Sequence, residues 1–485
     1  MVIAADISAM KNPARVLSCL LALVLLVAPA LAKEKPTGKD FNRSALQLIK
    51  SFEATYGGKV GVSTQVLKTG KIPLTYNGTS PLIPASNLKL VTTAAALDTL
   101  GEDFRFETRL YGPSKVEDGV VNGDLVLKGG GDPTFFPPFV KNPTSPFKNM
   151  AQVLRRNGIR RVNGELVIDD SDYDRHFISG SYHDRYLLDS YAAPVGGLGV
   201  NRNVATVSVG PKGMFVEPSS GSLQLVNDVK LGGYNQIWAE RPRGTDKVIV
   251  HGVAQPGKTV QTTLTVNDPV RFAGSTFYRI LERAGVDFSG GWTTVKEGQP
   301  ADLRGKVLLA KHRSPRLKEL IERTNTESDN VLAQHIFRRM GASLVGFGSA
   351  KNSEAVIRDF FKRNNINDAG LKMVDGSGLS EKNRIAPYQV VHVLRTMWGH
   401  DQGQLFIDSL PGPGEGTMRS RLGGALVRAK TGTLNNHSGL SGYVVTAYGE
   451  TIGFSILVND VKSTWPAVEL QNKLVGLLAS WDKPL

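Results

Sequence analysis

Residues 84–101 read PASNLKLVTTAAALDTLG. Proline is tolerated in the first turn of a helix, and the residues that follow it here are mostly apolar or small. Its apolar side chains fall on more than one face of a helix, which is typical of a helix buried in a core. They are Leu88, Leu90, Val91, Ala94, Ala95 and Leu97. The stretch therefore predicts a buried helix over residues 84–100, around which the rest of the fold is organised.

Ser86 and Lys89 lie at the start of this predicted helix. They lie three positions apart, about one helical turn, so the hydroxyl and the amine share one face. A lysine amine has a pKa of ~10.4 in water, and both burial and a second nearby cation would lower it. The helix N-terminus adds free amides and a partial positive field. The pair meets the needs of an activated serine nucleophile.

The Ser-x-x-Lys spacing alone is a weak signal, because it occurs twice more in the chain. Ser8 and Lys11 fall in an N-terminal leader, and Ser145 and Lys148 are interpreted as an N-cap serine and a surface lysine. The assignment of Ser86 therefore depends on other motifs.

Ser328-Asp329-Asn330 occurs once, between predicted helices at 317–323 and 330–340. On a turn, the hydroxyl of Ser328 could relay a proton and the carboxamide of Asn330 could bind a substrate amide. Considered in isolation, the triplet also fits an ordinary helix cap.

Lys430-Thr431-Gly432, followed by Thr433, lies on a predicted late strand. The lysine would supply positive charge, the glycine would let a substrate approach the backbone, and the strand edge could pair with an extended peptide. The same letters at Lys68-Thr69-Gly70 are interpreted as the turn of a hairpin over residues 58–76.

Together and in this order, the three motifs resemble the active-site set of penicillin-binding proteins and class A β-lactamases. The chain most resembles the class C low-molecular-mass penicillin-binding proteins, peptidase family S13, which include D-alanyl-D-alanine carboxypeptidases and endopeptidases. The long separation of Ser86 and Ser328 is typical of that family. Further matching stretches are GGGDP at 129–133, NTESDNVLAQHIF at 325–337, DGSGLS at 375–380 and AKTGTLNNHSGLSGY at 429–443.

The resemblance implies a role for each motif. Ser86 would attack the carbonyl between two D-alanines and form an acyl-enzyme, with Lys89 taking its proton. Ser328 would pass a proton to the leaving D-alanine, and Asn330 would hold the substrate amide. The substrate-binding strand residues would be Lys430, Thr431, Gly432 and Thr433, and backbone N–H groups of Ser86 and Thr433 would form the oxyanion hole.

The resemblance also implies an α/β (α+β) fold: a penicillin-binding/β-lactamase-like transpeptidase domain with an antiparallel sheet between helices. The stretch 105–304 consists mainly of short alternating runs separated by turn residues, so a β-rich insertion of one or two domains is expected. The expected boundaries are a signal peptide at 1–32, transpeptidase parts at 33–104 and 305–485, and the insertion at 105–304.

The N-terminal segment has the order of a secretory signal. Lys11 and Arg15 precede an apolar run, which is followed by Ala30-Leu31-Ala32. Export to the periplasm or cell-wall side is therefore expected. Cys19 lies inside the segment, so the mature chain would contain no cysteine for disulfides or thiolate catalysis.

The chain carries a formal net charge of +14. Export argues against nucleic acid as the partner, and a peripheral association with an anionic membrane or wall surface is the more natural interpretation. The expected partners are peptidoglycan stem peptides ending in D-Ala-D-Ala, with β-lactam antibiotics as covalent inhibitors. No Gly-x-Ser-x-Gly, His-Glu-x-x-His or Walker motif is found, and neither a cofactor nor a metal is expected.

Two other functions remain open at this point: a β-lactamase-like hydrolase, and a non-catalytic wall-binding protein that retains the fold. Tyr182-His183-Asp184 in the insertion is interpreted as a surface loop rather than as part of a peptide side-chain pocket.

Overall fold

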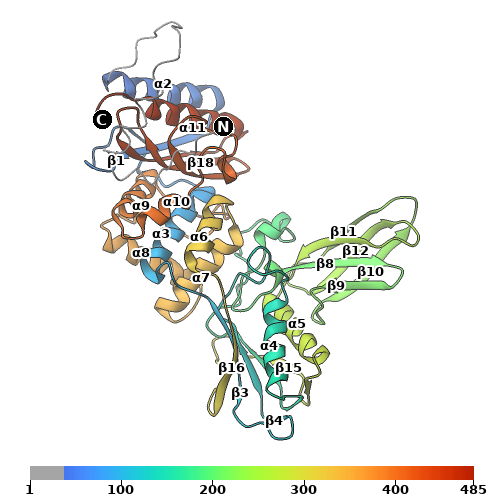
Figure 1. Cartoon of the computed structure of the whole chain (residues 1–485). Helices are drawn as coiled ribbons and strands as arrows, with labels where there is room; N and C mark the ends of the chain where they lie inside the picture. The colour runs from blue at the N-terminus through green and yellow to red at the C-terminus, as the bar shows by residue number, and fades with distance from the viewer. Residues whose placement is uncertain (1–37) are drawn as a thin grey trace, which may run out of the picture. The chain divides into compact units, whose positions relative to one another are not determined.

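The computed structural model describes residues 38–485, and the predicted signal segment and Cys19 lie outside them (Figure 1). The chain divides into two compact units. The first comprises residues up to 102 together with 318–329 and 357–485, and the second comprises 103–317 and 330–356. Each unit is therefore assembled from segments far apart in the sequence.

The first unit is built on a five-stranded antiparallel sheet in the order β17-β18-β19-β1-β2. β1 and β2 are the predicted hairpin, and β17 is the predicted late strand that carries Lys430. Their bounds are β1 Lys59–Val66, β2 Thr75–Tyr76, β17 Val427–Leu434, β18 His437–Val445 and β19 Thr451–Asn459.

Helices cover both faces of this sheet (Figure 1). On one face, α2 (Gly38–Tyr56) and α11 (Trp465–Ala479) share an apolar core with alternate residues of the strands. On the other face α9 (Pro387–Gly399) packs on β1 and β19, and α3 (Leu88–Leu100) packs on α9. Residues Leu88 to Leu97 of α3 are all buried, as the apolar pattern predicts. Further helices are α6 (Leu317–Thr326), α10 (Gly403–Asp408) and the second half of α8 (Ala350–Arg363), whose residues up to 356 belong to the second unit.

In the second unit, a main sheet and two helices contribute side chains to a shared apolar core. Its main sheet has the order β15-β7-β5-β3-β16. The strands β15, β7 and β5 are parallel to one another, whereas β3 is antiparallel to both of its neighbours, β5 and β16. Helices α4 (Ser145–Arg156) and α5 (Pro269–Arg283) pack together. The strands of the main sheet are β3 Glu107–Pro113, β5 Leu125–Lys128, β7 Leu166–Asp169, β15 Trp292–Thr294 and β16 Lys306–Arg313.

Three smaller sheets complete the second unit. Their orders are β14-β6-β4, β13-β8-β9 and β10-β12-β11. The strands are β4 Val120–Asn122, β6 Arg161–Asn163, β8 Val204–Gly210, β9 Gly213–Glu217, β10 Gln224–Leu231, β11 Gln236–Glu240, β12 Lys247–Ala254, β13 Val260–Thr265 and β14 Asp287–Phe288. Helix α7 (Asn330–Val345) also belongs to this unit.

The structure divides the chain at different points from those expected. The insertion was expected to end at residue 304, but β16 pairs with β3, so the second unit continues to Leu317. Ser145, interpreted as an N-cap, is the first residue of α4, and Thr144 occupies the capping position. α5 begins at Pro269, and Asp268 caps it by accepting a hydrogen bond from the Arg271 amide.

No helix among residues 38–485 is long and apolar enough to cross a membrane.

Candidate active site

Ser86 lies in a short 3₁₀ turn, Ala85–Asn87, that leads directly into α3. Ala85 has a φ of 47°, a left-handed conformation that is uncommon for a residue with a side chain. The chain just before the turn is held by Asn459 of β19, whose side chain exchanges two hydrogen bonds with the backbone of Ile83. Ser86 is half-buried, whereas Ala85 and Asn87 are buried. The turn therefore places the Ser86 hydroxyl at the N-terminal end of a buried helix.

Lys89 points back toward this hydroxyl. Its Nζ donates to Ser86 Oγ at 2.9 Å and to the Ser377 carbonyl at 2.7 Å. The side chain is fully buried. Burial lowers the pKa of Lys89 to about 7, although the charges of Asp375 and Asp329 act in the opposite direction. A substantial fraction of the amine is therefore unprotonated near neutral pH and can accept the Ser86 proton.

The loop that supplies the Ser377 carbonyl is folded around the buried carboxylate of Asp375. This carboxylate accepts hydrogen bonds from the amides of Ser377, Gly378 and Ser380 at 2.6–2.9 Å. Thr92 of α3 also donates to the Gly376 carbonyl at 2.8 Å. Asp375 thus fixes the loop that holds Lys89.

Sequence reasoning did not identify Asp375 as part of the site. The run DGSGLS was noted only as a matching stretch. The feature that could have indicated this role is an aspartate followed by small residues, because an aspartate side chain readily accepts hydrogen bonds from the backbone amides that follow it.

β17 brings the Lys-Thr-Gly motif to the same turn. Lys430 is fully buried, and its Nζ donates to the Thr431 carbonyl at 2.9 Å. Burial, together with the nearby Lys89, lowers the pKa of Lys430 well below its ordinary value. A Cβ atom on Gly432 would lie 2.8 Å from the Ser86 nitrogen, so the strand backbone is packed directly against the nucleophile turn.

The remaining residues of this strand lie at the edge of the sheet. Thr431 is half-buried and its Oγ1 donates to Thr417 Oγ1 at 2.8 Å, whereas Thr433 is exposed. β17 is the terminal strand in the order β17-β18-β19-β1-β2. An edge strand keeps backbone groups available for an extended peptide.

Gly378 provides a test of how closely the loop and the nucleophile turn are packed. It has a φ of 85°, and a Cβ atom there would overlap the carbonyl of Ala85. We expect Gly378→Ala to lower the free energy of unfolding by at least about 2 kcal/mol through backbone strain and overpacking. Denaturant titration followed by circular dichroism measures this change.

The matched control for Gly378→Ala is Gly476→Ala in α11. A Cβ atom at Gly476 would meet nothing within 4 Å, and this glycine lies inside a helix. The control should be neutral or stabilising by up to about 1 kcal/mol. Equal unfolding midpoints for the two variants would show that the loop does not pack as described.

The chain passes from the first unit to the second within the Ser-Asp-Asn motif. Ser328 has a φ of 60° and belongs to the first unit, as does Asp329, whose Oδ2 lies 3.6 Å from Arg323 Nε. Asn330 begins α7 in the second unit, where its Nδ2 donates to the Tyr191 carbonyl at 3.1 Å. The structure thus groups Ser86, Lys89, Lys430 and Gly432 directly, and the charge of Asp329 acts on the pKa of Lys89.

Tyr182 lies near Asn330 in the second unit. Its half-buried side chain and Tyr191 line a small hollow together with Asn330. His183 and Asp184 are exposed, as expected of a surface loop. Tyr182 lies in the same loop as the other two residues and also lines this hollow.

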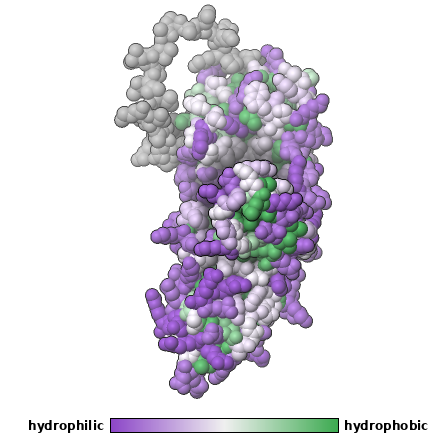
Figure 2. Space-filling model, turned by 90° about the vertical axis from the view of Figure 1, so that its right-hand side faces the viewer, coloured by the Kyte–Doolittle hydropathy of each residue, from purple (hydrophilic) through white to green (hydrophobic). Residues whose placement is uncertain are grey.

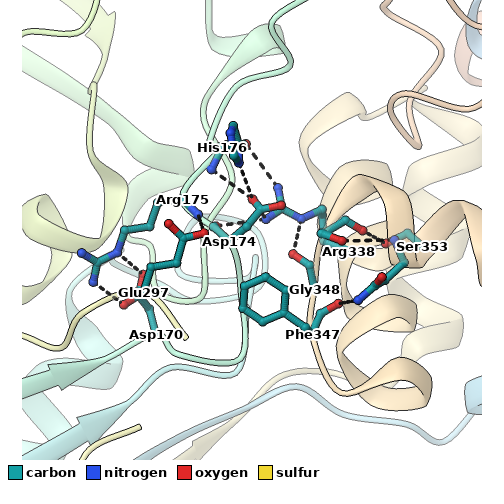
Figure 3. Close-up of polar contacts among 11 residues, drawn as sticks. Asp170, Asp174, Arg175, His176, Glu297, Arg338, Phe347, Gly348 and Ser353 are labelled. Carbon is teal, nitrogen blue, oxygen red and sulfur yellow. Dashed lines mark hydrogen bonds and ion pairs between the residues drawn. The ribbon is translucent and has the colours of Figure 1, made fainter. Parts of the chain in front are cut away.

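The helix that begins at Asn330 is anchored in the second unit by Arg338 (Figure 3). The buried Arg338 forms an ion pair with Asp174 at 2.5 Å, and its Nε donates to the Gly348 carbonyl at 2.6 Å. One turn earlier, His335 Nδ1 lies 2.8 Å from the Gly131 carbonyl oxygen. These contacts fix the position of α7, and therefore of Asn330, within its unit.

No group of three or more His, Cys, Asp or Glu side chains that could hold a metal ion occurs within residues 38–485.

Comparisons with known proteins give matches along most of the chain. The model of the D-Ala-D-Ala carboxypeptidase 3 (S13) family matches residues 46–481. A D-alanyl-D-alanine carboxypeptidase of Actinomadura sp. (strain R39) is 31% identical over 489 residues, which cover 95% of this chain and 89% of the relative. The D-alanyl-D-alanine carboxypeptidase DacB of Haemophilus influenzae is 25% identical over 427 residues, covering 83% of this chain and 86% of the relative.

A solved structure has the same fold. The crystal structure of penicillin binding protein 4 (dacB) from Haemophilus influenzae superimposes with a TM-score of 0.77 at 23% identity, covering 89% of this chain and 99% of that chain. The expected penicillin-binding fold class, with an antiparallel sheet between helices, is confirmed. Family model, sequence relative and fold agree, and the chain belongs to the D-Ala-D-Ala carboxypeptidase 3 (S13) family.

Proposed function

We propose that this S13 protein hydrolyses the peptide bond between two D-alanines at the end of peptidoglycan stem peptides, through an acyl-enzyme on Ser86. The observation that carries the proposal is the 2.9 Å hydrogen bond from Lys89 Nζ to Ser86 Oγ. A lysine whose pKa is lowered to about 7 is matched to proton transfer at neutral pH.

In the acylation step, Ser86 Oγ attacks the carbonyl carbon of the penultimate D-alanine while its proton moves to Lys89 Nζ. The C–N bond then breaks, and the departing amine of the terminal D-alanine takes up a proton relayed through Ser328. Water attacks the ester in the second step, and this releases the shortened peptide and restores the Ser86 hydroxyl.

The amides of Ser86 and Thr433 are proposed to stabilise the oxyanion of each tetrahedral intermediate. The close approach of Gly432 to the Ser86 nitrogen supports this, because it sets the β17 backbone beside the nucleophile amide. Amides fixed before reaction stabilise developing charge without reorganising.

The terminal carboxylate of the substrate is proposed to bind Lys430, Thr431 and Thr433, with Asn330 holding the substrate amide. Burial disfavours the charged form of Lys430. An incoming carboxylate favours that form, so we expect substrate binding to raise the pKa of Lys430 again.

β-Lactams are proposed to acylate Ser86 and to leave slowly. A structure of the Haemophilus influenzae protein was solved in complex with a β-lactam, which supports carrying this property to the present chain. Residues 1–32 are proposed to be a removable signal that exports the protein to the periplasm or wall side, where both kinds of ligand occur.

Incubation of the purified protein with muropeptides, followed by mass spectrometry, tests the activity. We expect pentapeptide stems to lose one D-alanine, and cross-linked dimers to yield monomers if the protein also acts as an endopeptidase. A protein that hydrolyses penicillin rapidly but leaves both substrates intact would be a β-lactamase. One that changes neither penicillin nor muropeptides would be a non-catalytic wall-binding protein.

A further inference from the structure

The sheet β10-β12-β11 of the second unit has one buried face and one open face. Val248 and Val250 of β12 point into the core and are fully buried. Side chains alternate across a strand, so His251 lies on the opposite face. Figure 2 views the molecule from the side on which β10, β11 and β12 lie in Figure 1, and it shows a group of apolar residues among hydrophilic ones.

Three side chains form a row across this open face. His251 of β12 pairs in register with Asp228 of β10 on one side and with Trp238 of β11 on the other. The Trp238 and His251 rings are stacked, with centroids 5.7 Å apart and planes at 25°. Trp238 nevertheless remains 55% exposed. The row therefore presents a flat aromatic surface to solvent.

The imidazole that stacks on the tryptophan has a carboxylate oxygen near each of its two nitrogens. His251 Nδ1 lies 2.7 Å from Asp228 Oδ2, and its Nε2 lies 3.4 Å from Glu240 Oε2. Trp238 Nε1 makes no hydrogen bond with any other residue of the described chain. The hydrogen bond with Asp228 thus orients His251, and Trp238, stacked on this ring, keeps a donor for a ligand.

The platform lies in a hollow of about 260 Å³. This is near the lower end of the range for small-ligand pockets, ~300 Å³. Exposed aromatic rings, carboxylate and amide oxygens, and N–H donors all contribute to its wall. Six of its eight lining residues have polar or aromatic side chains, namely Asp228, Lys230, Tyr234, Gln236, Trp238 and His251, and the other two are Gly252 and Val253.

We propose that this hollow, the Trp238 hollow, binds a saccharide chain, namely the amino-sugar glycan strand of peptidoglycan. A pyranose ring has an apolar C–H face that can stack on Trp238 and hydroxyl and acetamido groups at its edge. Asp228 and Gln236 offer acceptors and donors for those groups. Saccharide binding goes beyond the proposed hydrolysis, and only the choice of glycan rests on the proposed function.

Other ligands fit this face less well. Asp228 and Glu240 are both exposed and lie near the ring. Lys230 is the one lysine or arginine that lines the hollow, so the two carboxylates outnumber it and would oppose an anionic lipid surface or a nucleic acid backbone. A neutral glycan with many hydroxyl groups meets no such opposition.

Isothermal titration calorimetry with a peptide-free N-acetylglucosamine tetramer tests the inference on the whole protein. We expect binding to the unaltered chain and an affinity at least about tenfold lower for Trp238→Ala, because a stacked ring is lost. Asp228→Asn should weaken binding less. Trp465→Ala is the matched control, since Trp465 is also exposed, at 68%, but lies in the first unit.

Absence of binding to the unaltered chain, or equal affinities for Trp238→Ala and the unaltered chain, would overturn the inference. Sedimentation velocity tests whether the open face instead binds a second copy of the chain. If the unaltered protein is a dimer, Trp238→Ala is a monomer and neither binds the glycan, the face would be assigned to self-association. Penicillin labelling of the variants reports on folding. The tetramer contains no peptide, so failure here is distinguishable from failure to cleave muropeptides.

Discussion

Ser86→Ala is expected to abolish both covalent penicillin labelling and release of D-alanine. The variant has no oxygen to form the ester, whereas Lys89, Lys430 and the surrounding loops remain in place. Removal of a serine nucleophile lowers kcat by about 10⁴- to 10⁶-fold in enzymes that use one. Labelling with a fluorescent penicillin and assay of D-alanine from a synthetic peptide measure the two losses.

Ser145→Ala is the matched control, because Ser145 and Lys148 repeat the Ser-x-x-Lys spacing in α4 of the second unit. This variant should retain full labelling and full peptide hydrolysis. If Ser145→Ala lost activity while Ser86→Ala kept it, the nucleophile would have been assigned to the wrong pair.

Lys89→Met is expected to slow acylation by about 10²- to 10⁴-fold, the usual contribution of a general base. Methionine fills a similar volume without a charge, so the variant should fold. The reduction should appear in the rate of penicillin acylation measured by stopped flow. Lys148→Met, which alters the exposed lysine of the second pair, should leave that rate unchanged.

The pH dependence follows from the same residue. Because the pKa of Lys89 is lowered to about 7, the amine is protonated below that pH and cannot accept the Ser86 proton. Acylation of the unaltered protein should fall about tenfold for each pH unit below 7 and level off above it. An acylation rate that stays flat from pH 5 to pH 9 would contradict the role of Lys89 as base.

Local patterns predicted the parts of the fold that depend on short-range periodicity. The apolar residues of α3 and the strand-like stretch of β17 around Lys430 each identify their element without reference to the rest of the chain. The Ser-x-x-Lys pair could be chosen over its two copies only from the order of the later motifs.

Features that depend on long-range pairing could not be predicted in the same way. β16 has a strand-like sequence, but only its pairing with β3 assigns it to the second unit. The role of Asp375 depends on Lys89, which lies far away in the sequence and meets it through the Ser377 carbonyl. The division of Ser328 and Asn330 between two units likewise follows from the contacts of α7, such as the ion pair of Arg338 with Asp174.

The most direct test of the central claim is peptide mass mapping of the folded protein after brief exposure to benzylpenicillin. The account predicts one adduct with the mass of the intact antibiotic, on the proteolytic peptide that contains Ser86, and none on that peptide in Ser86→Ala. An adduct located on Ser328, Ser145 or any other residue, or a folded protein that acquires no adduct, would contradict it.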